Sequence, residues 1–305
     1  MSGTSVTHSF ELYPPRSART AAALPAALDA LAATGPEFFS ITYGASGATT
    51  DASFDLVRRV AAATDVDVMA HLTCAGTSPA ETAALVRRFL DLGARRFLAL
   101  RGDAVEGGAH GALRSAAELV QLIHRVHAER DTWPGRDLPG GRLQAAARPA
   151  RVAVAAFVNG HPGSRSRTDH LDALLAKQVA GADLAITQLF FHPEDYASFV
   201  ERARRWGITI PIVPGVLPVT SPARLRRMLE LSGEDEPRDL AIALEVEPTD
   251  EGRYEIGVDH ASRFAAALIA AGAPALHLYT FNQADAVGAV LARLDLAPAL
   301  TKETT

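Results

Sequence analysis

The sequence predicts an α/β protein whose 305 residues form one domain, a single (β/α)8 barrel of the TIM type. Short apolar runs of strand length alternate along the chain with longer segments of helical period, and this alternation is typical of parallel sheets. Eight such strand–helix units fit a chain of this length, and eight units close a barrel. An open, doubly wound sheet is the alternative. No Gly-x-Gly-x-x-Gly motif follows the first strand, which removes the strongest sign of that fold.

The eight predicted strands are apolar runs. In chain order they are Ser9–Tyr13, Phe38–Thr42, Val66–Leu72, Arg96–Leu100, Val152–Phe157, Leu184–Leu189, Ile208–Val213 and Ala275–Tyr279. The predicted helices have the helical spacing of apolar residues and fall between these runs. They cover Ala18–Ala33, Ser53–Ala63, Pro79–Leu92, Leu113–Arg130, Thr168–Ala180, Pro193–Trp206, Ser221–Leu231 and Val258–Ala271.

Two segments interrupt this pattern. Residues at about 131–150 are rich in Pro, Gly and Arg, and we expect them to form a surface excursion before the fifth strand. Gly233–Arg238 is expected to be a second, charged excursion after the seventh helix. Neither segment is expected to divide the chain into domains. Gly272, just beyond the last predicted helix, is expected to cap it.

Composition and charge narrow the class of partner. With 48% apolar and 21% charged residues, the chain can bury a large core. Its 30 basic and 35 acidic residues give a net charge of −5, which argues against nucleic acid as the main partner. No apolar stretch reaches membrane-spanning length. The single cysteine, Cys74, excludes an intrachain disulfide and suits a reducing compartment, so we expect a cytoplasmic protein.

Glu11 is the first candidate catalytic residue, because a barrel of this type carries its active site at the carboxyl ends of its strands. If Phe10 and Leu12 face the helices, alternation along the strand directs Glu11 into the barrel mouth. Burial there would raise the pKa of the carboxyl, which suits a general acid near neutral pH. The alternative is a structural ion pair with an arginine such as Arg101.

Other strand ends carry polar residues whose meaning is less specific. The spacing in His71-Leu72-Thr73-Cys74 resembles a metal motif, but no second ligand pair exists, so zinc is not expected. Cys74 is more readily explained as a small buried apolar residue than as a nucleophile. Arg101-Gly102-Asp103 places a carboxylate after the fourth strand. Arg165 and Arg167, after the fifth strand, fit a solvated turn and a phosphate contact equally well.

A series of short motifs stands at the strand ends in a fixed order. They are Ser9-Phe10-Glu11 with Pro14-Pro15, Thr42-Tyr43-Gly44, His71-Leu72-Thr73-Cys74, Leu100-Arg101-Gly102-Asp103, Ile186-Thr187-Gln188-Leu189-Phe190-Phe191, Pro214-Gly215-Val216-Leu217-Pro218 and His277-Leu278-Tyr279-Thr280-Phe281-Asn282. Their order and spacing resemble the methylenetetrahydrofolate reductase family over nearly the whole chain. Each motif alone would be a weak signal, and the series is a specific one.

The resemblance implies a (β/α)8 barrel that reduces methylenetetrahydrofolate to methyltetrahydrofolate with NADH or NADPH, and in family members FAD relays the hydride. It implies that Glu11 protonates the bridging nitrogen of the folate and so opens the five-membered ring to an iminium that accepts hydride. Asp103 would bind and orient the pterin as the second catalytic residue, and Gln188 would hydrogen-bond the same ring system. Tyr279 would lie near the substrate, and Gln283 near the folate tail.

The resemblance also implies a set of cofactor-binding positions. They are Thr42, His71, Arg101 and Gly102 at the ends of strands two to four, and Phe157, His161 and Lys177 in the fifth unit. The chain departs from the family mainly here. Ser115-Ala116 replaces a Tyr-Ala pair that packs on the flavin. His170, Ala173 and Ala176 replace an acid, an amide and a basic residue on the helix after strand five, where only Lys177 matches. Pro222 and Gln283 likewise replace an aromatic and a basic residue.

These departures lead to a hypothesis about the cofactor. Each charged hydrogen bond to a diphosphate contributes roughly 1–3 kcal/mol, so losing several would weaken FAD binding by orders of magnitude. We therefore expect weak or absent FAD and a direct hydride transfer from the nicotinamide to the folate iminium. The competing hypothesis is that Arg165 and Arg167 hold the FAD phosphates in a different way.

Two alternatives come from other functional classes. One is a non-catalytic folate-binding barrel, although binding alone does not need an acid such as Glu11. The other is a metal-dependent aldolase or hydrolase assembled from His71, His161, Glu11 and Asp103, which the folate pattern explains with less freedom. The sequence leaves open the choice between NADH and NADPH and the oligomeric state.

Overall fold

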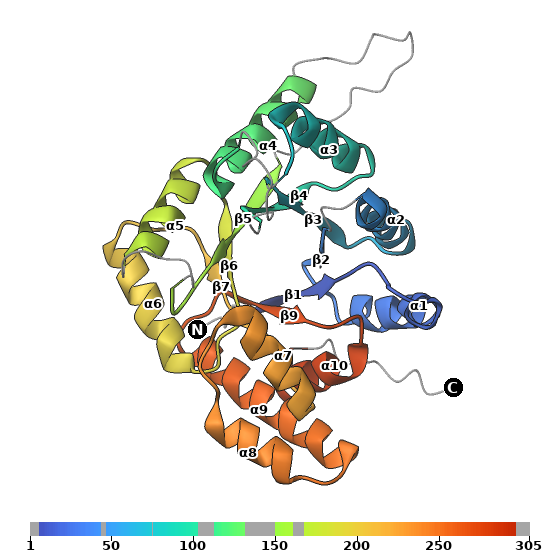
Figure 1. The fold of residues 1–305 in the computed structure, drawn as a ribbon, viewed down its shortest axis with the longest axis vertical. Helices are drawn as coiled ribbons and strands as arrows, with labels where there is room; N and C mark the ends of the chain where they lie inside the picture. The colour runs from blue at the N-terminus through green and yellow to red at the C-terminus, as the bar shows by residue number, and fades with distance from the viewer. Residues whose placement is uncertain are drawn as a thin grey trace.

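The strands form a parallel sheet that curves round a central axis, and the helices surround it (Figure 1). The computed structural model describes residues 6–43, 47–74, 76–102, 113–131, 150–160 and 168–296. The strands are β1 (Thr7–Leu12), β2 (Phe38–Ile41), β3 (Asp67–Thr73), β4 (Arg96–Leu100), β5 (Arg151–Ala156), β6 (Leu184–Thr187), β7 (Ile212–Val213), β8 (Gly215–Val216) and β9 (Ala275–Tyr279). The predicted α/β barrel is confirmed.

Two short strands share the seventh position of this barrel. The sheet order is β7-β6-β5-β4-β3-β2-β1-β9-β8, so its two edge strands are neighbours in the chain. Pro214 separates them, and its carbonyl accepts a hydrogen bond from the backbone N–H of His277 at 3.0 Å. β7 pairs with β6 through Ile212, and β8 pairs with β9 through Gly215. The described strands therefore fill eight positions and bring the sheet round on itself.

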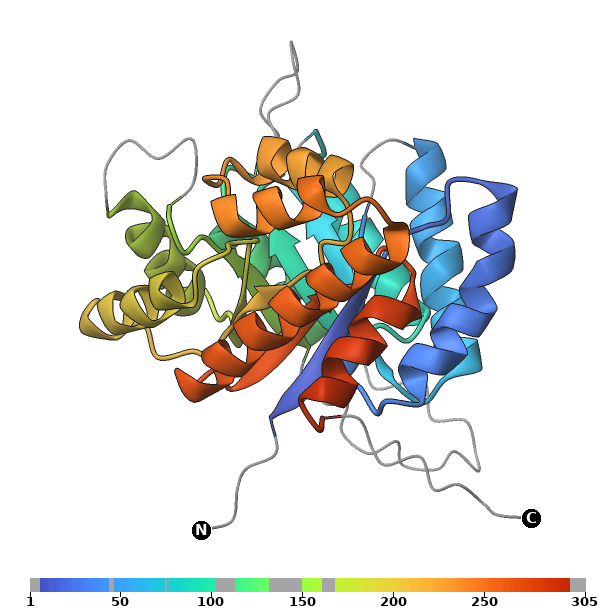
Figure 2. The ribbon, with the colours of Figure 1, turned by 90° about the horizontal axis from the view of Figure 1, so that it is seen from below.

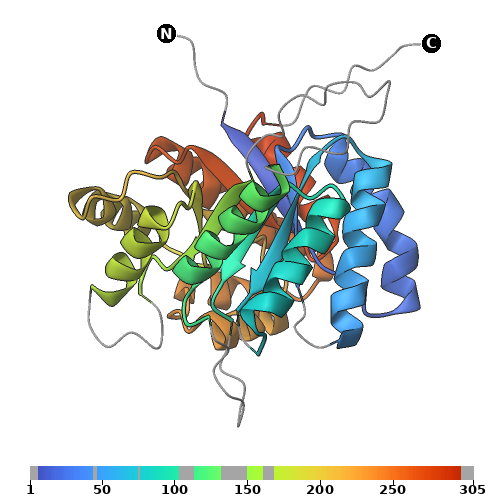
Figure 3. The ribbon, with the colours of Figure 1, turned by 90° about the horizontal axis from the view of Figure 1, so that it is seen from above.

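The described helices cover the outside of the sheet and one of its ends. They are α1 (Ala18–Ala32), α2 (Gly47–Ala63), α3 (Pro79–Asp91), α4 (Ala116–Asp131), α5 (Asp169–Val179), α6 (Pro193–Arg205), α7 (Pro222–Ser232), α8 (Arg238–Val246), α9 (Asp250–Ala270) and α10 (Ala284–Arg293). Figure 3 shows α2, α3 and α4 side by side on the outer face. Among these described helices, none is long and apolar enough to cross a membrane.

Local sequence explains where several helices begin. Ser78 and Glu81 form a capping box on α3, in which each side chain accepts a hydrogen bond from the other residue's backbone N–H. The Ser221 hydroxyl caps α7. Gly272 follows the end of α9 with φ +89°, so the residue predicted to cap that helix does lie in the left-handed region.

The side chains of the strands divide between two apolar layers. Phe10, Leu12 and Phe39 point outward and belong to the main core, which packs the sheet against the helices. Phe38 and Met69 point inward and join Leu98, Ala153 and Ile186 in a smaller cluster that fills the barrel interior. This filling leaves polar side chains for the two ends of the barrel.

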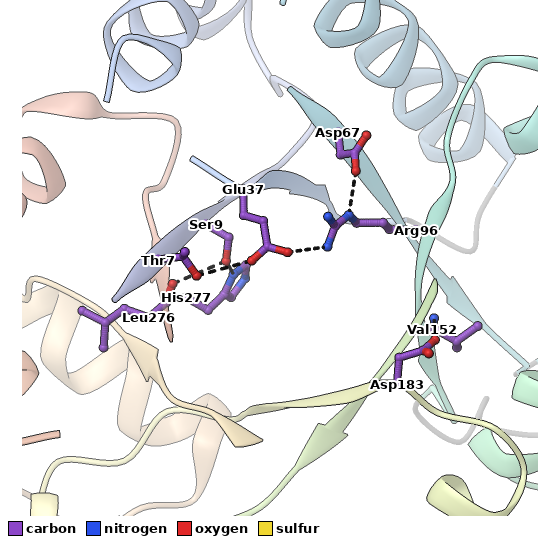
Figure 4. A network of polar contacts seen from close by, with 9 residues as sticks. All are labelled: Thr7, Ser9, Glu37, Asp67, Arg96, Val152, Asp183, Leu276 and His277. Carbon is purple, nitrogen blue, oxygen red and sulfur yellow. Dashed lines mark hydrogen bonds and ion pairs between the residues drawn. The ribbon is translucent and has the colours of Figure 1, made fainter. Parts of the chain in front are cut away.

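The amino-terminal end of the barrel is held by the buried Arg96 (Figure 4). Its guanidinium donates to Glu37 at 2.9 Å and to Asp67 at 3.0 Å. Thr7 at the start of β1 donates to the same Glu37 carboxylate at 3.4 Å. Across the barrel, the Asp183 carboxylate accepts the backbone N–H of Val152 at 2.6 Å. These bonds tie the starts of the strands together at the end opposite the predicted active site.

The structure corrects one predicted strand. The seventh strand was expected at Ile208–Val213, but it begins at Ile212 and continues beyond Pro214. The carbonyls of Ile208 and Ile210 accept hydrogen bonds from the Arg204 guanidinium at 2.7 and 3.0 Å, so this backbone is bonded to a side chain instead of a neighbouring strand.

Several helix boundaries also differ from the prediction. The last predicted helix begins at Asp250 instead of Val258, because the Thr249 hydroxyl caps it by accepting the Gly252 N–H at 3.0 Å. This helix precedes β9, and the helix that follows β9 is α10, which was not predicted. α8 was not predicted either, and it begins at Arg238, where the expected charged excursion ends. α2 begins at Gly47 instead of Ser53. The excursion expected at about 131–150 falls almost wholly outside the described residues.

α7 and α8 lie over the end of the barrel opposite the start of β1 (Figure 2). They build a separate apolar cluster that is not part of the main core, with Leu217, Val219, Leu225, Leu240 and Leu244 among its buried members. Tyr279 and Phe281 pack against this cluster from β9 and the segment after it. The pair α7 and α8 therefore forms a wall on one side of the barrel mouth.

Candidate active site

Glu11 lies near the carboxyl end of β1 and points into the barrel. Its neighbours in register are Ser40 on β2 and Tyr279 on β9, while Phe10 and Leu12 on either side are fully buried against the helices. The Glu11 side chain is 24% exposed. Burial raises the pKa of its carboxyl to about 7. Roughly half of the molecules therefore carry a proton on Glu11 at neutral pH, as a general acid requires.

His71 on β3 is a titratable neighbour of this carboxyl. Its Nε2 lies 3.9 Å from Oε2 of Glu11, which is longer than a hydrogen bond. Burial lowers the pKa of His71 to about 3, so the ring is neutral and the contact is not an ion pair. Within the described residues, Nε2 is buried and has no hydrogen-bond partner. Because an unpaired buried polar atom costs free energy, this nitrogen is suited to a polar ligand atom.

The alternative partner for Glu11 was an arginine. Arg101 follows β4 and is exposed, and in the described part of the chain it makes no ion pair with Glu11. The described surroundings thus give no support to a structural ion pair, and the raised pKa of Glu11 has burial as its cause.

A buried polar group forms the floor beneath Glu11 and His71. His277 on β9 lies with Nδ1 2.8 Å from Oγ of Ser9 and with Nε2 3.3 Å from Oγ of Ser40. Its ring stacks on Phe38 with the ring centroids 5.9 Å apart. Burial lowers the pKa of His277 to about 3, so this ring is also neutral. Sequence reasoning assigned no role to this group, although its members occupy the inward positions of their strands.

The Tyr279 side chain extends from β9 past the seventh strand position to the backbone of β6. Its hydroxyl donates to the backbone carbonyl of Thr187 at 2.9 Å, and the Thr187 hydroxyl accepts the N–H of Gly215 at 2.9 Å. A Cβ on Gly215 would lie 2.6 Å from the Tyr279 ring, so only glycine leaves room for this crossing. Burial and the charge of Glu11 both raise the pKa of Tyr279, which places the two side chains near each other and keeps the phenol protonated.

Gln188 follows β6 with one half of its side-chain amide engaged. Its Oε1 accepts the N–H of Leu189 at 2.9 Å, while its own backbone N–H donates to Ala156 at 2.8 Å. The Nε2 amide NH2 has no partner among the described residues. A partly buried amide NH2 at the barrel mouth can donate to a ring carbonyl or ring nitrogen of a ligand.

Two cations lie near each other after β4 and on α5. The Lys177 ammonium donates to the carbonyl of Ala155 at 2.8 Å, and burial together with the charge of Arg101 lowers the pKa of Lys177 to about 8.

Cys74 donates from its thiol to the carbonyl of Arg101 at 3.2 Å. Burial is the main cause that raises the pKa of Cys74, so it is a structural thiol. Gly102 has φ +81°, a conformation that favours glycine at this turn.

The rim of the mouth is closed by the segment after β9. Asn282 accepts the backbone N–H of Tyr13 at 3.0 Å and donates to the Tyr13 carbonyl at 2.7 Å. The Tyr13 hydroxyl donates to the carbonyl of Phe281 at 3.1 Å. Phe281 and Asn282 have φ values of 49° and 58°, which cost of order 1–3 kcal/mol each and persist because these bonds hold them. Gln283, predicted to lie near the folate tail, is exposed beside them.

A family model for methylenetetrahydrofolate reductase matches residues 2–295. The chain belongs to the methylenetetrahydrofolate reductase family. The 5,10-methylenetetrahydrofolate reductase of Escherichia coli is 30% identical over 293 residues, covering 96% of this chain and 92% of that protein. Methylenetetrahydrofolate reductase (NADH) 1 of Zea mays is 29% identical over 303 residues, covering 94% of this chain and 48% of the maize protein. Methylenetetrahydrofolate reductase 1 of Schizosaccharomyces pombe is 30% identical and is covered to 46%.

Solved structures support the fold. A Clostridium thermocellum protein described as binding two copies of 5-methyl-5,6,7,8-tetrahydrofolic acid has a TM-score of 0.59 and 13% identity, with 95% of this chain and 93% of that chain covered. The structure of 2,3-dimethylmalate lyase, a member of the PEP mutase/isocitrate lyase superfamily, has a TM-score of 0.50 and 13% identity, with 99% and 87% covered. At these identities the likeness concerns the barrel and no particular chemistry.

In the family pattern, the helix after the fifth strand contacts the flavin. In this chain that helix is α5, and its residues differ from the pattern. The first turn of α5 carries Asp169 and Asp172. Of the positions compared with the family pattern, Ala173 and Ala176 are exposed and offer no donor, and His170 stacks on Phe199 with the ring centroids 6.0 Å apart. Lys177, the one matching cation, donates to the strand below. The described face of α5 therefore does not fit the diphosphate of FAD.

Some predicted site residues cannot be placed. Asp103, His161, Arg165 and Arg167 lie outside the described residues. Thr42 and Phe157 are partly buried at the ends of β2 and β5, on the side of the barrel where Glu11 lies. Among the residues that are described, no group of three or more His, Cys, Asp or Glu side chains could hold a metal ion.

Proposed function

We propose that this chain reduces 5,10-methylenetetrahydrofolate to 5-methyltetrahydrofolate with a hydride from NADH or NADPH. The observation that carries the proposal is a carboxyl group of pKa about 7, Glu11, buried in the barrel mouth beside the unpaired Nε2 of neutral His71. Membership of the family supports 5,10-methylenetetrahydrofolate as the substrate. The names of the plant relatives, which include NADH, support the nicotinamide.

Glu11 supplies the proton of the reaction. It donates to the bridging nitrogen of the folate, the bond from this nitrogen to the methylene carbon breaks, and the carbon is left as an iminium on the other nitrogen. Hydride from the reduced nicotinamide then adds to that carbon and completes the methyl group. One proton and one hydride account for the two-electron reduction. His71, whose pKa is about 3, stays neutral and can only orient the substrate or the Glu11 carboxyl.

The surrounding residues position the pterin. The Nε2 amide NH2 of Gln188 can donate to the pterin ring, and the Tyr279 ring, held against Thr187, supplies a rigid wall beside Glu11. Asp103, predicted to orient the same ring, remains in this proposal the second catalytic carboxylate beside Glu11.

We further infer that the hydride passes from the nicotinamide to the folate without FAD. The support is the described face of α5, where Ala173 and Ala176 offer no hydrogen-bond donor and the first turn carries the acidic residues Asp169 and Asp172. The folate iminium is itself a good hydride acceptor, so no relay is chemically required.

The test is oxidation of NADH, and separately of NADPH, by purified protein on addition of methylenetetrahydrofolate. The protein must show no flavin in its visible spectrum, and the assay is repeated with FAD supplied. Turnover without flavin is expected. Turnover only with FAD would contradict direct transfer and leave the reductase in place. No turnover in either assay, with 5-methyltetrahydrofolate still bound, would indicate the non-catalytic folate-binding barrel.

A matched pair of variants assigns the proton to Glu11. Glu11→Gln removes the proton donor while keeping the side-chain size, so turnover should fall at least about 100-fold with folate binding preserved. Glu201→Gln, an exposed carboxylate on α6, is the control and should leave turnover unchanged. Equal turnover in the two variants would contradict the role of Glu11.

A further inference from the structure

Arg224 lies in the first turn of α7, on the rim of the barrel mouth. Its backbone N–H donates to the hydroxyl of the cap residue Ser221 at 3.2 Å. Its guanidinium lies over the ring of Phe281, 4.9 Å from the centroid, and donates to the Thr220 hydroxyl at 3.2 Å. The cation is therefore held in one place.

Among the described residues, the charge of Arg224 has no counter-charge. In the described part of the chain no carboxylate pairs with it, whereas Arg226 and Arg227 on the same helix pair with Glu245 at 2.6 Å and Glu230 at 2.9 Å. Arg224 is also partly buried, and burial lowers its pKa. Because a partly buried cation without a partner costs free energy, an anionic ligand at this place would recover that cost.

The neighbours of Arg224 come from the other loops of the mouth. Its Nη2 lies 3.5 Å from Oε1 of Gln283, at the start of α10. The Tyr13 hydroxyl bonds to the Phe281 carbonyl, so a second aromatic ring lies on the same rim. This rim combines two aromatic rings with a cation and an amide.

The rim begins close to Glu11 in the chain. Tyr13 follows Glu11 by two residues, which is about 7 Å along an extended chain. A folate continues from its pterin into a p-aminobenzoyl ring and then a glutamate with two carboxylates. A folate with its reacting nitrogen at Glu11 would therefore direct its aromatic ring toward this rim and its carboxylates farther along it.

We propose that Arg224 binds a carboxylate of the folate glutamate and that Gln283 positions its guanidinium. The proposal rests on the proposed function, since it needs Glu11 to hold the reacting end of the same molecule. Arg224 is then the residue that distinguishes folates with a glutamate from pterin p-aminobenzoates without one, through a charge-assisted pair.

The experiment titrates wild type and Arg224→Gln with 5-methyltetrahydrofolate and with the same reduced pterin p-aminobenzoate lacking glutamate. The variant should bind the glutamate form roughly 10–100-fold more weakly and the truncated form about as well as wild type does. Arg224→Lys should recover part of the loss. Arg226→Gln, on the same helix and paired with Glu245, is the control and should change neither affinity.

Each other outcome has a definite meaning. Equal weakening of both ligands by Arg224→Gln would show a structural role and overturn the proposal. An increase only in the KM of the nicotinamide nucleotide would place a phosphate at Arg224 and overturn it as well. Wild type that binds both ligands equally overturns it while leaving the proposed function standing. Wild type that binds neither ligand overturns both.

Discussion

Oε2 of Glu11 and Nε2 of His71 lie 3.9 Å apart, and burial shifts the two pKa values in opposite directions. It raises that of Glu11 to about 7 and lowers that of His71 to about 3. Burial disfavours the charged form of each group, so both side chains are neutral in slightly acidic solution. Of the pair, only Glu11 can change its protonation near neutral pH.

The pH dependence of turnover should therefore follow Glu11. The acid form is required, so kcat/KM should be highest below about pH 7 and fall about tenfold per pH unit above it. His71 should add no limb between about pH 5 and 9, because its pKa of about 3 lies below that range. The measurement is kcat/KM across this range at saturating nicotinamide. A rate that rises with pH would contradict the assignment.

Glu11 should also make the protein less stable as the pH rises. Its pKa is about 7 in the folded protein, against an ordinary value of 4.5 for a glutamate, so the folded state binds the proton more tightly. This contribution to stability is fully present below about pH 4.5 and is lost as the pH rises through 7, at most about 3 kcal/mol. Glu11→Gln should raise the Tm relative to wild type at pH 8 but not at pH 4.5. An equal effect at both values would show that ionisation is not the cause.

The sequence was sufficient for the barrel and for the direction of Glu11, because both follow from short-range periodicity. Arg96–Leu100 and Ala275–Tyr279 have the predicted bounds, since each is a short run in which apolar residues predominate. The inward position of Glu11 follows from the burial of Phe10 and Leu12 on the opposite face.

The side-chain contacts of the site and the unpredicted helix depend on segments that are distant in the chain. Tyr279 and Thr187 are 92 residues apart, and Arg224 and Gln283 are 59 apart, so no local pattern indicates that they meet. α8 was not predicted; its buried Leu240 and Leu244 belong with Leu217 and Val219 to a cluster separate from the main core. The pKa of about 7 for Glu11 is likewise a result of burial in the complete fold.

Gly215 should be required for the position of Tyr279. In Gly215→Ala the new Cβ would lie 2.6 Å from the Tyr279 ring and 2.9 Å from the Thr187 carbonyl. Relief of this clash should cost about 1–3 kcal/mol of stability and displace the ring that lies beside Glu11, so kcat/KM should fall. Gly288→Ala is the control, because nothing lies within 4 Å of its Cβ and a helical alanine should stabilise α10 by up to about 1 kcal/mol. Equal thermal melts and equal activity in both variants would contradict the argument.

Arg96 should matter for stability and not for chemistry. Its side chain is 9% exposed and bonds both Glu37 and Asp67 at the starts of the strands, the end of the barrel away from Glu11. Arg96→Met leaves two partly exposed carboxylates without their partner, which should cost about 1–3 kcal/mol and lower the Tm by several degrees. Arg87→Met breaks an exposed pair with Glu129 and should cost no more than about 1 kcal/mol. The activity of the folded fraction, measured well below the Tm, should equal that of wild type in both variants. A loss of kcat in Arg96→Met at that temperature would mean that the two ends of the barrel are coupled.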